Sequence, residues 1–167
     1  FFSASPINTD ALKKKIDEVF ASTQVEILFE EKNTLWCMIN GVKVSFISRF
    51  DTLLAPVETD GYFKLADIKD ITVMKLRAVC GREEYKDFFD LACIAEKTDV
   101  RSWVLWWQEI YPKQDITSWV VALSAVDTVQ EIPLETSEDF KGKDVSGNIK
   151  RVVQEVTKHV RIMGDTD

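Results

Sequence analysis

The chain has 167 residues, of which 46% are hydrophobic and 29% are charged, so it can bury a core in one domain or in one domain with an appendage. Its net charge of −7 argues against a surface broadly matched to nucleic acid, although one local basic patch stays compatible with it. His159 is the only histidine, which nearly excludes His-based metal sites and Ser-His-Asp triads. Three cysteines without CxxC spacing, and no visible secretory signal or transmembrane-length run, predict a cytoplasmic protein with reduced thiols.

The first part of the chain predicts one helix and then three strands. Residues 8–22 have apolar side chains at helical spacing, with Thr9 or Asp10 as the expected N-cap. The pattern then changes to strict alternation in three runs, centred on Ile27, Cys37 and Val44. Asn40-Gly41 separates the second run from the third and is a strong signal for a two-residue hairpin turn. These residues therefore predict a meander of three antiparallel strands.

The remainder predicts a loop over residues 51–64 and then helices. One helix is expected from about Asp67 to Cys80, with Gly81 as its C-cap, and a second lies within residues 80–96. Short helices are expected in 100–112 and 115–126, where tryptophans at i, i+3 and i+4 favour core packing over base stacking. An acidic linker over 129–143 precedes a last helix with an apolar face. The fold class is therefore α+β, with a helical C-terminal part.

Charged residues interrupt the apolar faces of the two central helices. Lys75 falls in the middle of an apolar stripe, and an unpaired buried ammonium is very costly. The expected stripe consists of Ile68, Ile71, Thr72 and Val79. Asp87 and Asp90 lie at i and i+3 on a helix that is apolar nearly all round, so they can share one cation. Lys75 and Arg82 are the candidate cations. The structural alternatives are a surface lysine packed by its stem and an ion pair that locks two helices together.

The same residues resemble a known family. The stretch DIKDITVMKLRAVCGREEYKDFFDL, residues 67–91, is similar to the paired signature of the AbiEii/AbiGii abortive-infection toxins, which resemble nucleotidyltransferases. The matching positions are Asp70-Ile71, Lys75, Arg82 and Lys86-Asp87-x-x-Asp90. Residues 39–50 and 147–160 resemble the family's hydrophobic strand and closing helix more weakly.

The resemblance implies a toxin of a toxin–antitoxin, phage-defence system that transfers NMP from an NTP to an acceptor, for which some members of the family suggest tRNA. Residues 1–66 would belong to a nucleotidyltransferase-like core, and residues 67–167 to a helical region. Lys75, Asp87 and Asp90 are the implied catalytic residues, and Lys75, Arg82 and Lys86 the implied nucleotide-binding residues. The implied cofactors are Mg²⁺ and the NTP. The implied partners are the NTP, an acceptor RNA and a cognate antitoxin, with no membrane.

The family also implies a Gly-Ser loop and an Asp-x-Asp strand that would hold Mg²⁺. Phe1-Phe2 matches the end of that strand, which places the Asp-x-Asp pair before residue 1. Residues 1–167 are thus expected to include no metal ligand, and we expect this chain alone to be inactive. An upstream Gly-Ser loop and Asp-x-Asp in the gene would support the toxin interpretation, whereas an initiator Met directly before Phe1 would support its rival.

The rival interpretation is a non-catalytic binding module, or a degenerate relative, that binds an antitoxin, another protein or RNA. Ser45 favours it, because nucleotidyltransferase folds often carry a third acid in such a hydrophobic-x-hydrophobic setting. Basic residues of the last helix offer a candidate RNA contact, although a solvated polar face explains them more simply. They are Lys150, Arg151, Lys158 and Arg161.

Overall fold

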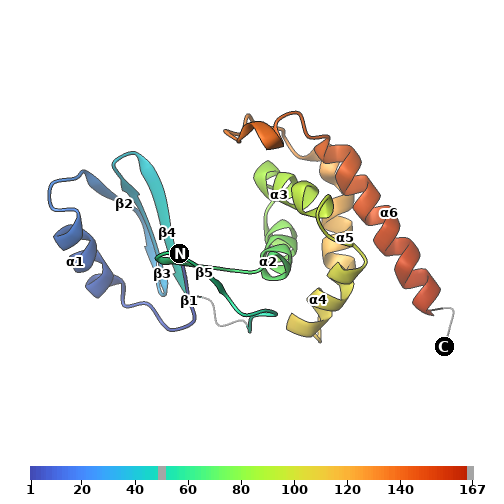
Figure 1. Cartoon of the computed structure of the whole chain (residues 1–167), viewed down its shortest axis with the longest axis horizontal. Coiled ribbons are helices and arrows are strands. Elements are labelled where there is room, and N and C mark those ends of the chain that lie inside the picture. The colour runs from blue at the N-terminus through green and yellow to red at the C-terminus, as the bar shows by residue number, and fades with distance from the viewer. Residues whose placement is uncertain (49–51, 165–167) are drawn as a thin grey trace. The chain divides into compact units, whose positions relative to one another are not determined.

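The computed structural model describes residues 1–48 and 52–164. It divides into two compact units, Phe1–Thr52 and Leu53–Asp167, which are described separately (Figure 1). The fold is α+β, as expected: the described residues form one sheet of four strands, one sheet of two strands and six α-helices. No helix in the described part of the chain is both long enough and apolar enough to cross a membrane.

The first unit is a four-stranded sheet with one helix. Its elements are β1 (Phe2–Ser3), α1 (Thr9–Val19), β2 (Val25–Glu31), β3 (Thr34–Ile39) and β4 (Val42–Ser48). The sheet order is β1-β4-β3-β2, and β2, β3 and β4 form the expected antiparallel meander. Asn40 and Gly41 both have positive φ, as the predicted hairpin turn requires. The last residues of the family-like strand motif, 49 and 50, lie outside the described residues.

Two details at the start of the chain concern the cap of α1 and the first strand. Asn8, and not Thr9 or Asp10, caps α1, because its side chain accepts a hydrogen bond from the amide of Ala11. Residues 2–3 form a short strand that pairs in parallel with β4, so that Phe2 lies opposite Ile47.

The core of the first unit lies between α1 and one face of the sheet. Its fully buried members alternate along β3 and are joined by one residue of α1; they are Ile16, Leu35, Cys37 and Ile39. Because side chains alternate across a strand, Trp36 and its cross-strand partner Ser45 lie on the opposite face. The ring of Trp36 contacts Phe29 at 4.8 Å between centroids.

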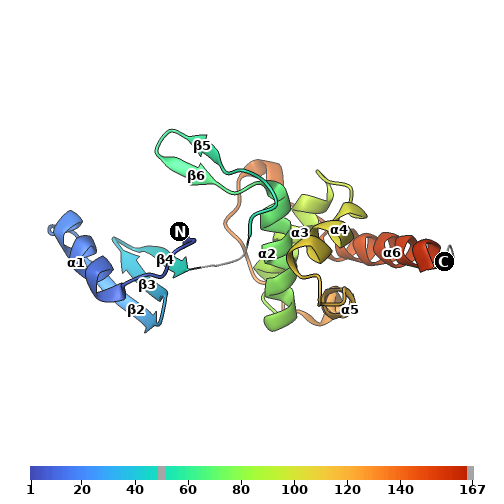
Figure 2. The ribbon, with the colours of Figure 1, turned by 90° about the horizontal axis from the view of Figure 1, so that it is seen from below.

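The second unit begins with a hairpin and continues as a helical bundle. Its elements are β5 (Glu58–Asp60), β6 (Phe63–Leu65), α2 (Ile68–Gly81), α3 (Tyr85–Ala95), α4 (Ser102–Ile110), α5 (Thr117–Ser124) and α6 (Val145–Gly164), with short 3₁₀ turns at Val126–Thr128 and Glu138–Phe140. The expectation of a loop over 51–64 was therefore wrong for β5 and β6, which project from the bundle near the start of α2 (Figure 2). The missed signal is Gly61, which has positive φ and begins the two-residue turn Gly61-Tyr62 between strands too short to show alternation.

The boundary expected after residue 66 lies inside this second unit. The buried carboxylate of Asp70 on α2 accepts hydrogen bonds from the amides of Leu54 and Ala55, at 2.8 and 3.3 Å. These bonds attach the segment that precedes the hairpin to the helices.

The core of the second unit is built around α3, which contacts both α2 and α6. Trp103, Trp107 and Trp119 are fully buried in it. The prediction that the tryptophan spacing reflects core packing is therefore confirmed. The apolar face of α6 supplies Val145, Ile149, Val152 and Val156. The helices thus hold α3 between two layers, which explains why it is apolar nearly all round.

Candidate functional site

A short connection places Lys75 of α2 beside the carboxylates of α3. Asp67 caps α2 by accepting a hydrogen bond from the amide of Lys69, and α2 ends at Gly81 with Arg82 as its C-cap residue. Only residues 82–84 separate the two helices, so the chain turns back at once. Gly81 was expected to be the C-cap; it is instead the last helical residue.

Four charged side chains meet at this turn, and we call them the ion cluster: Lys75, Arg82, Asp87 and Asp90. The ammonium of Lys75 donates to Asp87 Oδ1 at 2.9 Å and also contacts a carboxylate oxygen of Asp90. Arg82 donates from Nε to Asp87 Oδ2 at 2.8 Å and from a terminal nitrogen to Oδ1 at 3.3 Å. Asp87 and Asp90, which lie at i and i+3 on α3, therefore share the cation of Lys75, as expected.

Burial differs sharply within the ion cluster. The side chain of Asp87 has no exposed surface, whereas those of Lys75, Asp90 and Arg82 are 25%, 42% and 46% exposed. Asp87 is thus the fixed centre of the cluster, and the other three form its solvent side.

The electrostatics keep Lys75, Arg82 and Asp87 charged at neutral pH. Burial acts to raise the pKa of Asp87, but hydrogen bonds from Arg82 and Lys75 outweigh it, so this pKa lies below the ordinary value. Burial acts to lower the pKa of Lys75, but hydrogen bonds to Asp90 and Asp87 outweigh it and raise this pKa. The hydrogen bond to Asp87 is the main reason that the pKa of Arg82 is raised.

Lys86, the fifth residue expected at the site, pairs elsewhere. Its ammonium lies 2.6 Å from Glu84 Oε2, and its side chain is 49% exposed. The sequence motif places Lys86 directly before Asp87, but adjacent helical residues point about 100° apart. Its ion pair is therefore with Glu84, outside the ion cluster.

The apolar stripe expected on α2 is confirmed at Thr72 and Val79, which are buried, but not at Ile68 and Ile71. The buried face consists of Thr72, Val73, Leu76 and Val79, together with Asp70. Ile71, expected in that face, is 38% exposed, and Ile68 is half-buried. Lys75 therefore shares a stripe with two isoleucines that line a pocket, and Ile68 also packs against the core.

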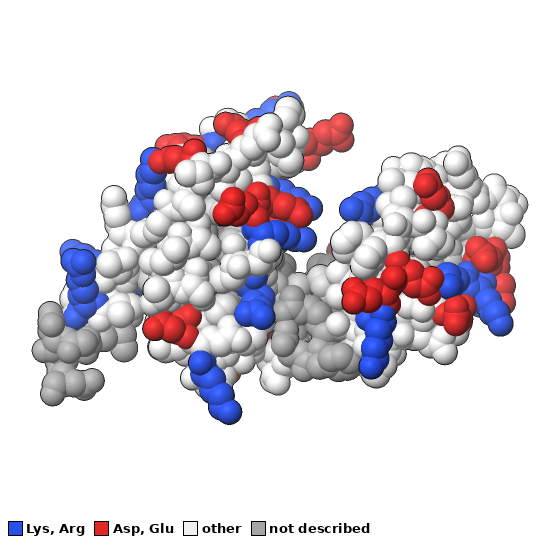
Figure 3. Space-filling view, turned by 180° about the vertical axis from the view of Figure 1, so that it is seen from behind, with Lys and Arg blue, Asp and Glu red and all other residues white. Residues whose placement is uncertain are grey.

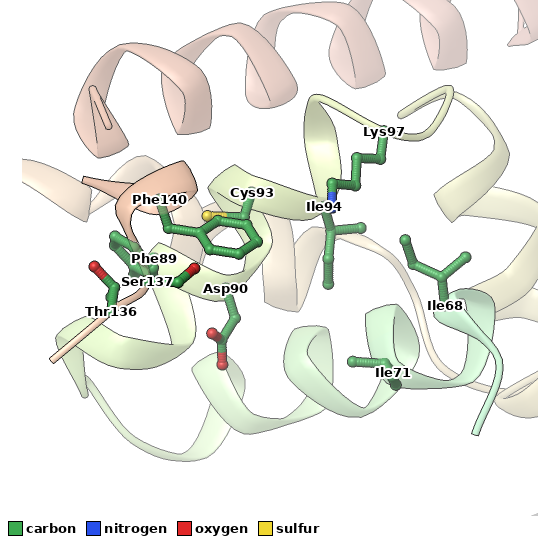
Figure 4. A pocket seen from close by; sticks show the side chains of 10 residues that line it. All are labelled: Ile68, Ile71, Phe89, Asp90, Cys93, Ile94, Lys97, Thr136, Ser137 and Phe140. Carbon is green, nitrogen blue, oxygen red and sulfur yellow. The ribbon is translucent and has the colours of Figure 1, made fainter. Parts of the chain in front are cut away.

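This pocket has a volume of about 550 Å³ and adjoins the ion cluster at Asp90. Its lining comes from α2, α3 and the segment before α6 (Figure 4): Ile68, Ile71, Phe89, Asp90, Cys93, Ile94, Lys97, Thr136, Ser137 and Phe140. Sequence reasoning missed it, because its third wall belongs to the segment expected to be a linker. The available signal was Phe140, the single aromatic residue in 129–143.

The described residues contain no preassembled set of three or more side-chain ligands for the implied Mg²⁺, that is, no such group of His, Cys, Asp and Glu side chains placed to hold a metal ion. In the ion cluster, both oxygens of Asp87 already accept hydrogen bonds from cationic side chains. A carboxylate that is neutralised in this way is a poor metal ligand, so we assign no step to a metal.

The basic residues of α6 are partly neutralised. Lys150 lies 2.6 Å from Asp127 Oδ2, and Arg151 donates both to Glu155 and to the carbonyl of Ala95. On the face shown in Figure 3, basic and acidic side chains are intermixed, without an extended basic surface among the residues drawn in blue, red and white. These contacts favour a solvated helix face over an RNA-binding surface.

Comparison with known proteins finds a relative of the whole chain. The chain is 28% identical over 159 residues to "Uncharacterized protein aq_aa25" of Aquifex aeolicus (strain VF5), an alignment that covers 92% of this chain and 75% of the relative. No family model and no solved structure matches the chain. The likeness to the Aquifex protein extends through both units, so their combination in one chain is shared with that relative.

Proposed function

We propose that this chain carries the nucleotide-binding helices of a nucleotidyltransferase-like protein, and that the ion cluster binds the phosphates of an NTP. The observation that carries the proposal is that two carboxylates hold the Lys75 ammonium, and that one of them, Asp90, lines a pocket large enough for a ligand. An ammonium has three N–H donors, and these two contacts use two of them. The third is available to a phosphate oxygen.

The proposed reaction is transfer of NMP to a hydroxyl of an acceptor. The acceptor oxygen forms a bond to the α-phosphorus, the bond from that phosphorus to the bridging oxygen breaks, and pyrophosphate leaves. The acceptor's proton is released to solvent. Catalysis of phosphoryl chemistry relies mainly on positioning and charge stabilisation, which Lys75 and Arg82 supply as fixed cations.

Asp87 and Asp90 have different tasks in this proposal. Asp87 is ionised and fully buried, so it holds Lys75 protonated and in place. Asp90 is partly exposed, and its contact within the ion cluster is with Lys75, so it can move when a phosphate arrives. When Asp90 moves away, a phosphate takes its place beside Lys75. A cluster whose four charges cancel can thus bind an anionic ligand.

The resemblance to abortive-infection toxins supports a biological setting for this chemistry. We propose a toxin of a phage-defence system, with a tRNA as acceptor and a cognate antitoxin as partner. The paired motif of residues 67–91 supports this setting, because its Lys, Arg and two Asp positions are the ones that meet in the ion cluster.

A non-catalytic binding module is the second candidate. Asp87 has both oxygens paired, which is also what a structural clamp between helices requires. In addition, Ser45 stands on β4 at a place where nucleotidyltransferase folds often have an acid. Under this candidate the ion cluster would stabilise the helices and bind no phosphate.

Removal of the Lys75 ammonium separates the two candidates. Binding of ATP, GTP, CTP and UTP to the chain is measured by isothermal titration calorimetry for wild type, Lys75→Ala and Lys69→Ala, in buffer with Mg²⁺. We expect the first variant to lose binding at least tenfold, and Lys69→Ala, which removes an exposed lysine of α2 outside the cluster, to bind as wild type. Transfer of labelled NMP to tRNA by the full gene product should likewise be abolished by Lys75→Ala. Equal binding by all three proteins would favour the structural clamp.

A further inference from the structure

We propose that the pocket beside Asp90 is the nucleobase subsite, and that residues 136–140 form its roof. The inference rests on the proposed function and deepens it, because it assigns the part of the nucleotide that the ion cluster does not contact. It concerns the second unit alone.

The pocket and the ion cluster are two ends of one groove between α2 and α3. On α2, Ile68, Ile71 and Lys75 lie within about 60° of each other around the helix axis. On α3, the positions of Asp87, Asp90 and Ile94 also share one side. Because Lys75 meets Asp87 while Ile68 and Ile71 share the pocket with Ile94, the two helices run in opposite directions along this groove.

The spacing along the groove suits one nucleotide. Ile71 precedes Lys75 by one helical turn, a rise of about 6 Å. A nucleotide extends over a similar distance from its base to its phosphates, with the ribose between them. Asp90 stands at that junction, since it contacts Lys75 and also lines the pocket. Its carboxylate accepts hydrogen bonds, and the ribose hydroxyls donate them.

The chemistry of the walls suits a flat heteroaromatic ring. Figure 4 shows the side chains of Phe89 and Phe140 at one end of the pocket, with Ile68 and Ile71 at the other. Aromatic and apolar walls favour the faces of a base, and stacking on such walls tolerates every base. The hydroxyls of Thr136 and Ser137 offer donors and acceptors to its edge.

The roof is anchored beside the pocket and is not a loose linker. The Lys97 ammonium lies 5.2 Å from the centroid of the Phe140 ring. Just beyond the roof, Lys143 pairs with Glu96 at the end of α3, and Asn148 of α6 donates to the same carboxylate at 3.1 Å. These contacts hold Phe140 over the groove, in a position to cover a bound base.

The test compares ligands with and without a base. Calorimetric titrations use ATP, GTP, CTP and UTP, and inorganic tripolyphosphate as the probe that lacks base and ribose. Phe140→Ala removes one wall, and Ser137→Trp fills the pocket from an exposed position of the roof. The matched controls are Phe63→Ala, an exposed aromatic of β6, and Glu135→Trp, which places the same ring in the same segment outside the lining.

We expect each pocket variant to weaken NTP binding about tenfold, the effect of losing one stacking contact, and to leave tripolyphosphate binding unchanged. The controls should bind both ligands as wild type does. If the pocket variants bind NTPs as wild type does while Lys75→Ala loses both ligands, the nucleobase subsite is refuted and the proposed function stands. If wild type binds neither NTP nor tripolyphosphate, both proposals are refuted.

Discussion

The two ends of the α2–α3 groove differ in chemistry, although the same two helices form both: one end is charged and the other is apolar. At one end, a carboxylate without exposed surface is compensated by two cations from its own chain, so the polar groups are satisfied internally. At the other end, isoleucine and phenylalanine side chains line a space of about 550 Å³ that the chain does not fill. A well-packed interior leaves few voids larger than a water molecule.

This difference indicates which end also serves stability: both ends are proposed to bind the NTP, but only the polar end is built on a buried ion pair. Breaking a buried ion pair leaves an uncompensated charge and is costly, whereas trimming a residue at the edge of an open pocket leaves no new cavity. Mutations at the polar end should therefore lower stability as well as ligand affinity, whereas mutations at the apolar end should lower mainly the affinity for NTPs. Changes of pH and of single residues can separate the two roles, from the largest expected effect to the smallest.

Removal of the buried carboxylate should give the largest loss of stability. Asp87→Ala removes the shared partner of Lys75 and Arg82, which keep their contacts with Asp90 and Glu84, so we expect the free energy of unfolding to fall by about 2 kcal/mol. Urea denaturation followed by circular dichroism measures it. A variant that unfolds at the wild-type urea concentration would show that the cluster does not stabilise the helices.

Acid should remove the same contribution in the wild-type protein. The pKa of Asp87 is lowered in the folded state, so its stabilising effect is complete above the ordinary value of 3.8 and is lost as pH falls from there through the lower folded-state pKa. We therefore expect the difference in stability between wild type and Asp87→Asn to be constant above that value and to shrink as the pH is lowered below it. Urea midpoints at several pH values measure it, and a difference that stays constant in acid would contradict the assignment.

The exposed carboxylate should matter much less to stability. Asp90 is 42% exposed and contacts one cation of the cluster, so Asp90→Ala should cost about 0.2–1 kcal/mol. The same variant should change NTP affinity more than tripolyphosphate affinity, since Asp90 is assigned to the ribose. Denaturation and titration of the one protein check both statements, and a stability loss as large as that of Asp87→Ala would remove the contrast.

The roof should contribute least to stability. Phe140 is half-buried in a short 3₁₀ turn, and we expect Phe140→Ala to lower the free energy of unfolding by less than about 1 kcal/mol. The measurement is again a urea titration. A larger loss would place Phe140 in the core and would make its effect on binding indirect.

The sequence was sufficient to predict the elements with strong patterns and the partners of Lys75. The helices and the meander follow from periodicity. The cost of burying a charge made Lys75 and Arg82 the candidate partners of Asp87 and Asp90, but the residues alone left a surface lysine packed by its stem as an alternative. The β5–β6 hairpin did not follow from periodicity, because strands of three residues carry no readable alternation. The sequence also did not predict which face of α2 is buried, because isoleucines that line a pocket have the same sequence pattern as isoleucines that face a core.

The pocket itself depends on contacts between residues far apart in the chain. Phe140 reaches the end of α3 through the ring contact with Lys97 and through the pairing of Lys143 with Glu96. No local pattern in 129–143 encodes these contacts, since they depend on where α6 packs. The partner of Lys86 was not predictable from the motif either. Its side-chain direction, and not its place next to Asp87 in the sequence, decides that it pairs with Glu84.

The most direct test of the central claim is an NMR titration that locates a bound nucleotide. Backbone ¹H–¹⁵N spectra of the ¹⁵N-labelled chain are recorded with increasing ATP, and then with tripolyphosphate. We predict the largest ATP-induced shifts around Lys75 and Asp87, at Ile71 and in residues 136–140, with tripolyphosphate shifting only the ion-cluster residues. ATP-induced shifts confined to other surfaces, such as the basic residues of α6, or no shifts at all, would contradict the account.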